Sequence, residues 1–540
     1  MPNSLFQFAE EVKRLFQPAL SVIAAGLCFA YAPPTPGQES VSMERLLEYR
    51  HLGDLQMAPD GTQAAFVATE NDLERNASHA HLWMVDFPSG QSRQLTMGDE
   101  RAAAPTWTPD GTRIAFLSNR GGPRRIWTIA PDGGEPQQAM PAQPLNVTQY
   151  RWLPDGTGFV FLAPDPPAPA AMTGQPPGMG RGIQRSPTEP IVVDANPRYQ
   201  RLYRHRIGAA QPDPLTRGNY HVTSLDISTE GGWVVMATQP RPGPGFGGHS
   251  DIMLLDLASG EARTLVTSPT SVASPQFSPD GQWVAFVSQD DPDANVLHNR
   301  YLQIVRADGS GRRTLSRPVD ENVLGFEWAG DGESLIFWVY QGVVNRVYRV
   351  DRAGGEPQLL EAFAGDWSLE RGGGVSFSHD GRSGAAALSN SGSPVEVYRL
   401  EAGSRQVHRV TAINQAFTEL APQTEVLSYT SEDGLDLEAL VVKPRDFQPG
   451  RRYPLLVVVH GGPPGVFTNA FVPRRGVYPT FAFADAGYVL LLPNPRGSTG
   501  YGERFRKPTS RTWAAETTGT SWPAWTGSLR TGWPIPTAWA

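Results

Sequence analysis

The sequence predicts a β-propeller of about seven blades followed by an incomplete α/β domain. A unit made of a turn and an apolar strand recurs roughly every fifty residues through most of the chain. After Gln423 this repeat gives way to a strand, a helix-compatible stretch and a second strand. That second pattern ends near Pro508, before a whole sheet could form. A length of 540 residues also favours more than one folded unit.

Each repeat begins with an Asp-Gly turn, or in one copy Glu-Gly, and runs on into an apolar strand. Glycine accepts the positive φ of a tight turn, and aspartate can bond its own backbone. A four-stranded sheet of this kind cannot bury its face alone, but blades in a ring can. Seven copies predict seven blades within residues 45–415. The turns are Asp60-Gly61, Asp110-Gly111, Asp155-Gly156, Glu230-Gly231, Asp280-Gly281, Asp331-Gly332 and Asp380-Gly381.

The spacing between the third and fourth copies is longer than the others. The extra residues run from about Pro164 to Pro197 and are rich in proline, glycine and alanine. This composition favours a loop outside the blade sheets over a further domain.

The stretch 424–507 opens with a hairpin whose turn is Asp433-Gly434. The apolar run LLVVVH follows, and we expect it to be a strand buried on both faces of a mostly parallel sheet. It ends in the string HGGP, residues 460–463. A helix-compatible stretch ends at Gly487, and the strand YVLLLPN leads into NPRGSTGYG, residues 494–502. Strand, helix and strand predict the opening of a doubly wound sheet.

The strings HGGP and NPRGSTGYG, together with the upstream repeats, resemble the prolyl oligopeptidase family of serine peptidases. The resemblance is to its acylaminoacyl-peptidase and dipeptidyl-peptidase branches, and it covers roughly residues 45–507. It implies an α/β-hydrolase fold for the second domain and hydrolysis of short peptides through an acyl-enzyme, without a cofactor. It also implies that the propeller covers the active site and restricts entry to short peptides.

In α/β-hydrolases, the glycine-rich loop after this strand donates backbone N–H groups to the oxyanion of the tetrahedral intermediate. The resemblance therefore implies that His460, Gly461 and Gly462 line the oxyanion site. The alternative is a tight strand-to-helix turn, for which glycine is equally suited.

No catalytic residue can be assigned in the printed sequence. Acyl transfer on this fold needs a serine in G-x-S-x-G, then an acid, then a histidine. The sequence contains no G-x-S-x-G, and no histidine follows His460. Ser498 lies in a string that is a loop in the family and does not hold the nucleophile. We therefore expect the chain as printed to be inactive.

Residues 508–540 show neither helical nor strand periodicity. Family members continue here with a string close to GGGDYRDIMAGVDW. GC-rich codons for that string, read one base out of step, give AAETTGTSWPAWT, which is the sequence at residues 514–526. We expect a reading-frame shift near Lys507 that truncates the chain; the alternative is a natural divergent tail.

Composition excludes several other functions. The net charge of -8 disfavours a nucleic-acid partner. A single cysteine, Cys28, allows neither an internal disulfide nor a thiolate metal cluster. His79 and His81 could share a strand face, but they have no acidic or cysteine companion, so we expect no metal site.

The basic run from Arg198 to Arg206 is expected to be a solvated strand edge; the alternative is capture of a substrate carboxylate.

Residues 1–32 have the pattern of an export signal. Lys13 and Arg14 precede an apolar stretch, and Ala30-Tyr31-Ala32 fits a signal-peptidase site. The apolar stretch is too short for a confident membrane span. We expect a periplasmic or secreted protein with no membrane span after signal removal. The alternative is a cytoplasmic protein whose translation starts at Met43.

Two functions from different classes therefore remain. The first is a serine peptidase whose partners are short peptides. The second is a propeller that acts as a protein-interaction or binding module. The repeats alone do not separate these two, because one fold carries many functions.

Overall fold

The computed structural model describes residues 41–141, 143–166, 198–243, 249–289, 291, 298–370, 374–401, 403–431, 434–461, 464–475 and 477–506. The chain divides into two compact units, Met1–Val41 and Ser42–Ala540, and every described helix and strand belongs to the second. The predicted export signal (1–32), most of the insertion (167–197) and the tail (508–540) lie outside the described residues.

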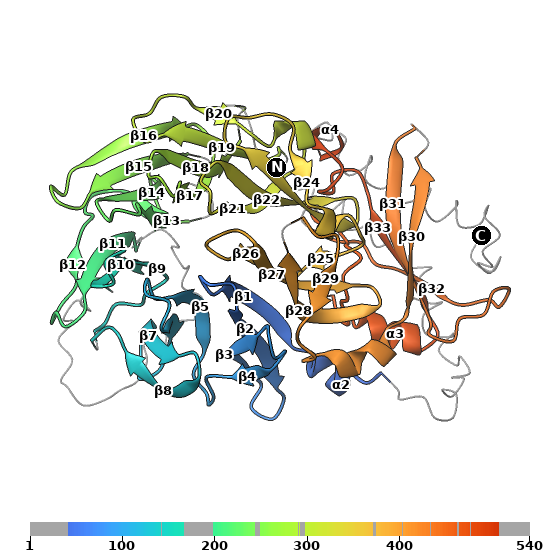
Figure 1. The fold of residues 1–540 in the computed structure, drawn as a ribbon. Coiled ribbons are helices and arrows are strands. Elements are labelled where there is room, and N and C mark those ends of the chain that lie inside the picture. The colour runs from blue at the N-terminus through green and yellow to red at the C-terminus, as the bar shows by residue number, and fades with distance from the viewer. Residues whose placement is uncertain are drawn as a thin grey trace, which may run out of the picture. The chain divides into compact units, whose positions relative to one another are not determined.

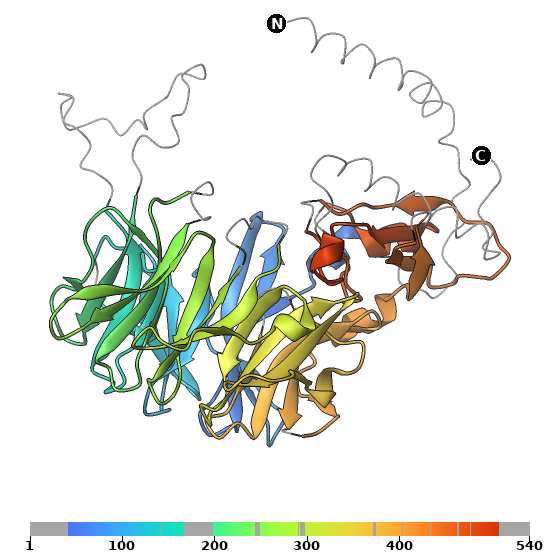
Figure 2. The ribbon, with the colours of Figure 1, turned by 90° about the horizontal axis from the view of Figure 1, so that it is seen from above.

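Seven antiparallel sheets follow one another around a ring, which confirms the seven predicted blades (Figures 1 and 2). In the first six blades four strands pair in chain order, and in the seventh two short strands share the first position. Blades one to four contain β1 (His51–Met57), β2 (Gln63–Asp72), β3 (Ala77–Asp86), β4 (Ser92–Gln94), β5 (Ala102–Trp107), β6 (Ile114–Ser118), β7 (Arg125–Ala130), β8 (Gly133–Gln138), β9 (Gln149–Trp152), β10 (Gly158–Pro164), β11 (Gln200–Arg206), β12 (Asp213–Pro214), β13 (His221–Ile227), β14 (Trp233–Gln239), β15 (Ser250–Asp256) and β16 (Ala262–Ser268). Blades five to seven contain β17 (Val272–Phe277), β18 (Trp283–Ser288), β19 (Tyr301–Arg306), β20 (Arg313–Thr314), β21 (Val323–Trp328), β22 (Ser334–Gln341), β23 (Val344–Asp351), β24 (Gln358–Leu359), β25 (Ser368–Leu369), β26 (Val375–Phe377), β27 (Ser383–Asn390), β28 (Ser393–Glu401) and β29 (Val407–Arg409).

The Asp-Gly turns, with Glu-Gly in the fourth blade, make the hairpin that leads into the apolar inner strand of each blade. In the second blade Gly111 has φ +69°, and an Asp110 carboxylate oxygen accepts from the Thr112 N–H at 3.1 Å. The strand after this turn, β6, is buried at every position, whereas β8 at the outside of the blade is largely exposed. Apolar residues of neighbouring inner strands therefore form the cores between blades, as in the cluster around Phe326 and Phe337 that joins blades five and six.

Carboxylates on the first strands also tie neighbouring blades together. Asp54 accepts from the Ala104 N–H at 2.9 Å, Asp226 from Phe277 at 3.0 Å and Glu327 from Phe377 at 3.1 Å. Burial raises the pKa of Glu327 to about 8. Each of these bonds joins a side chain of one blade to the backbone of the next.

The ring closes where the first blade meets the seventh. The His379 N–H donates to the Pro59 carbonyl at 3.1 Å. The Asn414 side chain bonds both backbone groups of Arg50, accepting from its N–H at 3.0 Å and donating to its carbonyl at 2.9 Å. No strand is shared across this junction in the described residues, because each blade is built from consecutive strands.

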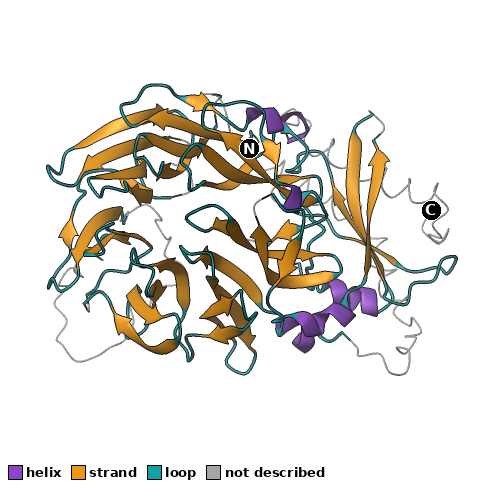
Figure 3. Cartoon of the chain, viewed as in Figure 1, coloured by secondary structure: helices purple, strands orange, loops and turns teal. Residues whose placement is uncertain are grey.

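The residues after the propeller form a mixed sheet in the order β30-β31-β33-β32, which contains the predicted strand, helix and strand. β30 and β31 are the predicted hairpin, β31 runs antiparallel to β33, and β32 runs parallel to β33. Its elements are β30 (Gln423–Thr430), β31 (Asp436–Lys443), β32 (Leu455–Val457), α3 (Thr480–Asp485) and β33 (Val489–Asn494). The remaining described helices are α2 (Met43–Leu47), η2 (Arg317–Val319), η3 (Glu361–Phe363), η4 (Gln415–Leu420) and α4 (Glu503–Arg506); helices are purple in Figure 3.

One prediction about this sheet is wrong. The run LLVVVH was expected to be a central strand buried on both faces, but β32 has only three residues and lies at the edge of the sheet. Val457 and Val459 are 42% and 52% exposed. The reason is that β33 is the only strand paired with β32 in the described part of the chain.

The basic run is not a solvated strand edge, because β11 pairs with β10 on one side and β12 on the other. Arg201 contacts the Asp165 carboxylate at 3.2 Å and donates to the Tyr220 carbonyl at 2.9 Å. Arg204 lies 3.5 Å from the Asp213 carboxylate. The guanidinium groups of Arg201 and Arg204 therefore already pair with protein groups of the same blade or the next one. This pairing argues against their capture of a substrate carboxylate.

Candidate active site

The strands β32 and β33 bring the two glycine-containing strings together. Parallel neighbours end at the same edge of a sheet, so the loops that follow them lie side by side. The first loop begins at Val458, whose N–H donates to the Leu491 carbonyl at 2.9 Å. The second loop begins at Pro495, directly after β33. The predicted site residue His460 therefore lies against the string NPRGSTGYG.

His460 and Ser498 are in direct contact, with the imidazole Nε2 3.0 Å from the serine hydroxyl. The same hydroxyl lies 2.6 Å from the Pro495 carbonyl oxygen, which can only accept. The Ser498 hydroxyl therefore donates its proton to the Pro495 carbonyl oxygen, and Nε2–H of His460 donates to the Ser498 oxygen. Ser498 is fully buried. The contact holds the loop after β32 against the loop after β33. The Ser498 hydroxyl is not exposed to a substrate.

The surroundings of His460 keep its ring neutral. Burial lowers the pKa of His460, and the Gly461 backbone offsets part of this effect. The ring packs edge-on against Phe467, with 5.1 Å between ring centroids. A neutral imidazole with its proton on Nε2 is the form that the bond to Ser498 requires.

Further bonds join the two loops beside this contact. The Thr499 hydroxyl donates to the Pro464 carbonyl at 2.7 Å, and the Thr499 N–H donates to the Gly465 carbonyl at 3.2 Å. A Cβ on Gly465 would lie 2.6 Å from Nδ1 of His460, so a larger residue would push the imidazole away. Glycine at this position lets the loop pass close to the ring.

Asn494, the last residue of β33, holds the far end of the first loop. Its carbonyl oxygen accepts from the Phe467 N–H at 2.7 Å, and its amide donates to the Phe467 carbonyl at 2.9 Å and to the Tyr501 hydroxyl at 3.0 Å. The Tyr501 hydroxyl donates in turn to Glu438 at 3.0 Å. Burial raises the pKa of Tyr501, and the Glu438 charge adds to the effect, so the phenol stays protonated.

Of the three predicted oxyanion-loop residues, the structure describes His460 and Gly461, and Gly462 lies outside the described residues. Gly461 is exposed, and a Cβ built on it meets no atom within 4 Å. The backbone at Gly461 therefore borders open space beside the braced loops. His460 itself faces Ser498, so its side chain acts in positioning the loop.

The second loop is also bonded to the propeller, a contact that the sequence did not predict. The Gly342 N–H, between β22 and β23, donates to the Gly500 carbonyl at 2.6 Å. The Gly502 N–H donates to Glu321 at 2.9 Å, and the Glu503 N–H donates to Asp320 at 3.1 Å. Acidic side chains thus accept the N–H of the first residue of α4 and that of the residue before it; the first N–H groups of a helix have no partners within it.

More polar contacts surround this junction. The Tyr301 hydroxyl lies 2.9 Å from Asp320 and 3.2 Å from Glu503. Arg506 donates to Asn299 at 3.0 Å. Burial raises the pKa of Glu321 to about 8. These residues lie close to two hundred positions apart in the chain, so no local pattern could have signalled the contact.

The two histidines of β3 do share a strand face, since the rings of His79 and His81 stack with centroids 6.1 Å apart. His79 lies 3.6 Å from Asp72, and His81 is buried. Within the described ranges, no group of three or more histidine, cysteine, aspartate or glutamate side chains is placed to share a metal ion. None of the described helices is long and apolar enough to cross a membrane.

No family model matches the chain. Among curated relatives, an "Uncharacterized peptidase YuxL" of Bacillus subtilis is 24% identical over 512 residues, spanning 84% of this chain and 70% of the relative. A "Dipeptidyl-peptidase 5" of Porphyromonas gingivalis is 22% identical over 522 residues, spanning 92% of this chain and 74% of the relative.

Solved structures of peptidases share the fold. An acylaminoacyl peptidase in complex with Z-Gly-Gly-Phe-chloromethyl ketone superimposes with a TM-score of 0.71 at 17% identity, covering 92% of this chain and 74% of that one. A Mycobacterium tuberculosis puromycin-hydrolyzing peptidase gives a TM-score of 0.66 at 17% identity, covering 93% and 75%. The arrangement of blades and the following mixed sheet is therefore shared with these proteins.

Proposed function

We propose that the chain carries the propeller and the first part of the α/β-hydrolase domain of a serine peptidase of the prolyl oligopeptidase family. The proposal rests on homology to peptidases of this family over most of the chain. The substrates of the complete peptidase are short peptides, cleaved through an acyl-enzyme. The relatives named as a dipeptidyl-peptidase and an acylaminoacyl peptidase support this substrate class.

One observation carries the proposal: the loop that holds His460 is fixed in place before any substrate arrives. Ser498 and Thr499 bond it from one side, and Asn494 bonds its far end. Fixed donors stabilise a developing negative charge without reorganising during the reaction. A loop that served only as a turn would not need this bracing from a second loop.

Within this loop, the backbone N–H of Gly461 is the described group best placed to donate to an oxyanion. Gly461 borders open space, whereas the neighbouring His460 is turned toward Ser498. Gly462 is the second donor in the proposal by its place in the string HGGP. The His460 side chain positions these two residues and does not transfer a proton.

The nucleophile, the acid and the catalytic histidine are not among the 540 residues printed above, because no G-x-S-x-G occurs and no histidine follows His460. Ser498 does not replace the nucleophile, since it is buried and its proton is held by Pro495. We therefore propose that this polypeptide alone does not turn over peptides. A serine-directed fluorophosphonate probe should leave it unlabelled.

The experiment that tests the family function starts from the gene. The nucleotide sequence after codon 507 should be translated in all three frames and searched for G-x-S-x-G, an aspartate and a histidine in that order. The corresponding longer protein should then be assayed with dipeptidyl and N-acylaminoacyl fluorogenic substrates. Turnover blocked by a fluorophosphonate supports the proposal. Absence of the three residues in every frame would overturn it in favour of a propeller that binds other molecules.

Two substitutions at Gly461 test the oxyanion role in that longer protein. Gly461→Pro removes the backbone N–H, so kcat should fall by roughly 10²–10³, as it does on loss of one oxyanion donor. Gly461→Ala keeps the N–H, and its Cβ enters open space, so it is the matched control and should stay close to wild type. Equal losses in the two variants would show that Gly461 acts through loop conformation.

A further inference from the structure

The strand β30 forms one edge of the second sheet. The sheet order is β30-β31-β33-β32, so β31 is the only strand in the described part of the chain that pairs with β30. Figure 1 shows β30 and β31 beside the propeller. In the proposed complete domain, further parallel strands would join the sheet at β32, because β32 and β33 form its parallel part. The edge at β30 therefore does not depend on how the sheet is completed.

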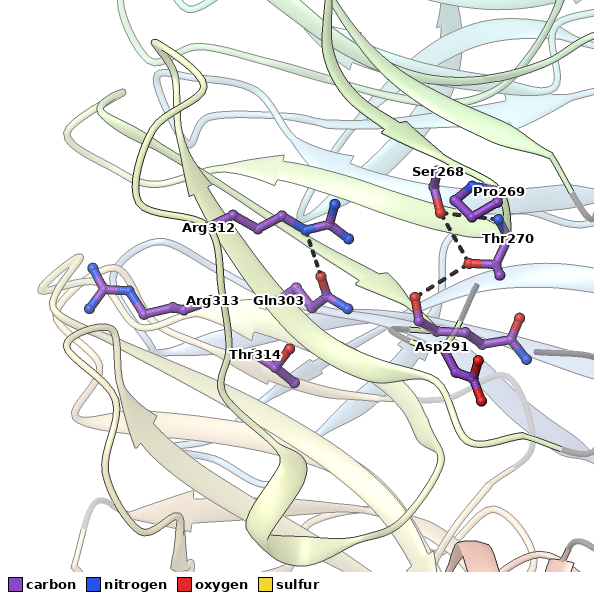
Figure 4. A pocket seen from close by; sticks show the side chains of 9 residues that line it. Ser268, Pro269, Thr270, Asp291, Gln303, Arg312, Arg313 and Thr314 are labelled. Carbon is purple, nitrogen blue, oxygen red and sulfur yellow. Dashed lines mark hydrogen bonds between the residues drawn. The ribbon is translucent and has the colours of Figure 1, made fainter. Parts of the chain in front are cut away.

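The propeller limits pairing at its outer strands. In five of the seven blades the described outer strand has only two or three residues, as in β4, β12, β20, β24 and β29. The outer strands β8 and β16 are longer, but a shift of register interrupts the pairing of each with its neighbour. Figure 4 shows the fifth blade, where β20 covers only Arg313–Thr314 and the adjacent Arg312 donates to Gln303 of β19 at 3.0 Å. Short strands, bulges and charged side chains all keep sheet edges from pairing with other chains.

By contrast, β30 is long and regular. Its eight residues, QTEVLSYT, pair with β31 without a shift of register. The segment contains no proline, and its one charged residue, Glu425, forms an ion pair with Lys443 of β31. Val426 is 41% exposed, and Leu427 is only partly buried against the core of the sheet. An edge of this kind is a template for another strand.

The hairpin shows which backbone groups of β30 point outward. The Ser431 N–H donates to the Leu435 carbonyl at 2.8 Å, and these two residues continue the register in which Thr430 faces Asp436. In an antiparallel pair, residues that exchange hydrogen bonds alternate with residues that do not. Counting back from Ser431, the odd-numbered residues of β30 therefore bond β31. The N–H and C=O groups of the even-numbered residues point away from β31, and these residues are Thr424, Val426, Ser428 and Thr430.

The four outward residues are arranged symmetrically about Leu427. A second β30 strand, antiparallel to the first and related to it by a twofold axis at Leu427, places Thr424 opposite Thr430 of the other copy. The same axis places Val426 opposite Ser428 of the other copy. Each pair joins two residues whose backbone groups point outward, so all four residues of both copies can exchange hydrogen bonds.

The side chains also suit this register. Leu427 faces its own copy at a position where the side chains of paired strands approach closely. Glu425 faces Tyr429 of the other copy, so no like charges are opposed. A twofold axis at Val426 is less favourable, because it sets the last outward residue opposite Pro422, which has no N–H. The edge is therefore self-complementary about one residue.

We propose that two copies of this chain associate through β30 and form one continuous sheet across a twofold axis at Leu427. A closed twofold pair covers the edge of both copies, so the association stops at a dimer. The edge contains no residue of the proposed active site. A failed peptidase assay and a failed association assay would be separate results.

Two measurements on the purified full chain test the dimer. Sedimentation velocity over a range of protein concentrations should show a monomer converting to a dimer. Residue-resolved hydrogen exchange should then locate the interface. The N–H groups of Val426 and Ser428 should gain protection as the dimer forms, whereas the N–H of Leu427 bonds β31 and should be protected in monomer and dimer alike.

Two double variants test the register. Val426→Glu with Ser428→Glu places like charges opposite each other, so the dissociation constant should rise by about tenfold or more. Val426→Lys with Ser428→Glu is the matched control, because the introduced charges face each other with opposite sign, and it should keep the dimer. Both positions are exposed, so the pairing of β30 with β31 should survive in each variant.

A third variant tests the backbone bonds. Ser428→Pro removes an outward N–H and no hydrogen bond to β31, so it should also weaken the dimer. Circular dichroism and urea denaturation show whether each variant is folded. If Ser428→Pro fails to fold, the two charge variants still decide the question.

Several results would overturn the proposal. One is a chain that stays monomeric at every concentration at which it is soluble. Another is an equal dissociation constant for the two double variants, because a dimer formed elsewhere would not respond to the sign of these charges. Protection at Val426 and Ser428 that does not change with protein concentration would also overturn it, since the edge would then be covered within one chain.

Discussion

Glu321 should make the stability of the protein fall as the pH rises. Its side chain is only 4% exposed, and it accepts the Gly502 N–H at 2.9 Å at the junction between the propeller and the second loop. Burial, reinforced by the neighbouring charge of Asp320, raises the pKa of Glu321 from 4.5 to about 8, although the Gly502 bond and Arg506 oppose the shift. The carboxyl is therefore neutral in the folded protein at pH 7.

The direction and size of the effect follow from proton linkage. Below pH 4.5 the carboxyl is protonated in both the folded and the unfolded chain, so it contributes no pH dependence. Between pH 4.5 and about 8 the unfolded chain has lost this proton and the folded chain keeps it, so the free energy of unfolding falls by up to about 1.4 kcal/mol per pH unit. Above about pH 8 both states are ionised and the effect is constant. The total loss is at most roughly 5 kcal/mol.

The substitution Glu321→Gln removes this titration and keeps an acceptor for the Gly502 N–H. The variant and wild type should be close in stability at pH 5, and the variant should be the more stable at pH 8. Urea denaturation followed by tryptophan fluorescence gives the global stability, and hydrogen-exchange protection of residues 500–506 reports on the junction. If hydrogen-exchange protection of residues 500–506 in Glu321→Gln keeps the wild-type pH dependence, the reasoning is refuted.

Glu327→Gln is the matched control for this experiment. Its carboxyl also has a pKa raised by burial to about 8, but it bonds the Phe377 N–H inside the propeller. This variant should change the pH dependence of global stability and leave the pH dependence of protection at Gly502 as in wild type.

Two other variants test the second sheet. Ser498→Ala leaves the buried Nε2–H of His460 without an acceptor, so the melting temperature should fall in line with a loss of about 1–3 kcal/mol; an unchanged melting temperature would mean that the contact does not hold the loops. Val457→Lys with Val459→Lys places one charge on the exposed edge strand β32 and one just after its end, and should raise the soluble yield, because apolar edges promote aggregation. The exposed Met97→Lys in the propeller is its control, and an equal gain there would contradict the argument.

Much of the propeller could be predicted because its signals are local. The Asp-Gly turn is encoded by two adjacent residues, and Gly61, Gly111 and Gly281 all have the positive φ that such a turn requires. The apolar strand after each turn is buried because every blade packs between two others. The same local reasoning found the hairpin of β30 and β31 and the order of strand, helix and strand in the second sheet.

Long-range pairing could not be predicted in the same way. LLVVVH has the composition of a central strand, yet its burial depends on how many neighbours it has, and β33 is the one found in the described residues. The run of arginines has the composition of a solvated edge, yet Asp165 and Asp213 from elsewhere in the blade pair with it. Composition fixes what a side chain can bond, and the fold decides which partner is present.

The string NPRGSTGYG joins the two parts of the molecule, and this explains why its contacts differ along its length. Asn494, Ser498 and Thr499 bond the loop of His460, whereas Gly500 and Gly502, which follow directly in the string, bond the propeller. A short segment held at both sides transmits a shift at one side to the other, because packed interiors deform little. Raising the pH ionises Glu321 and weakens the junction, so hydrogen-exchange protection at Thr499 should fall between about pH 5 and 8 in wild type. The fall should be absent in Glu321→Gln and should keep its wild-type size in Glu327→Gln.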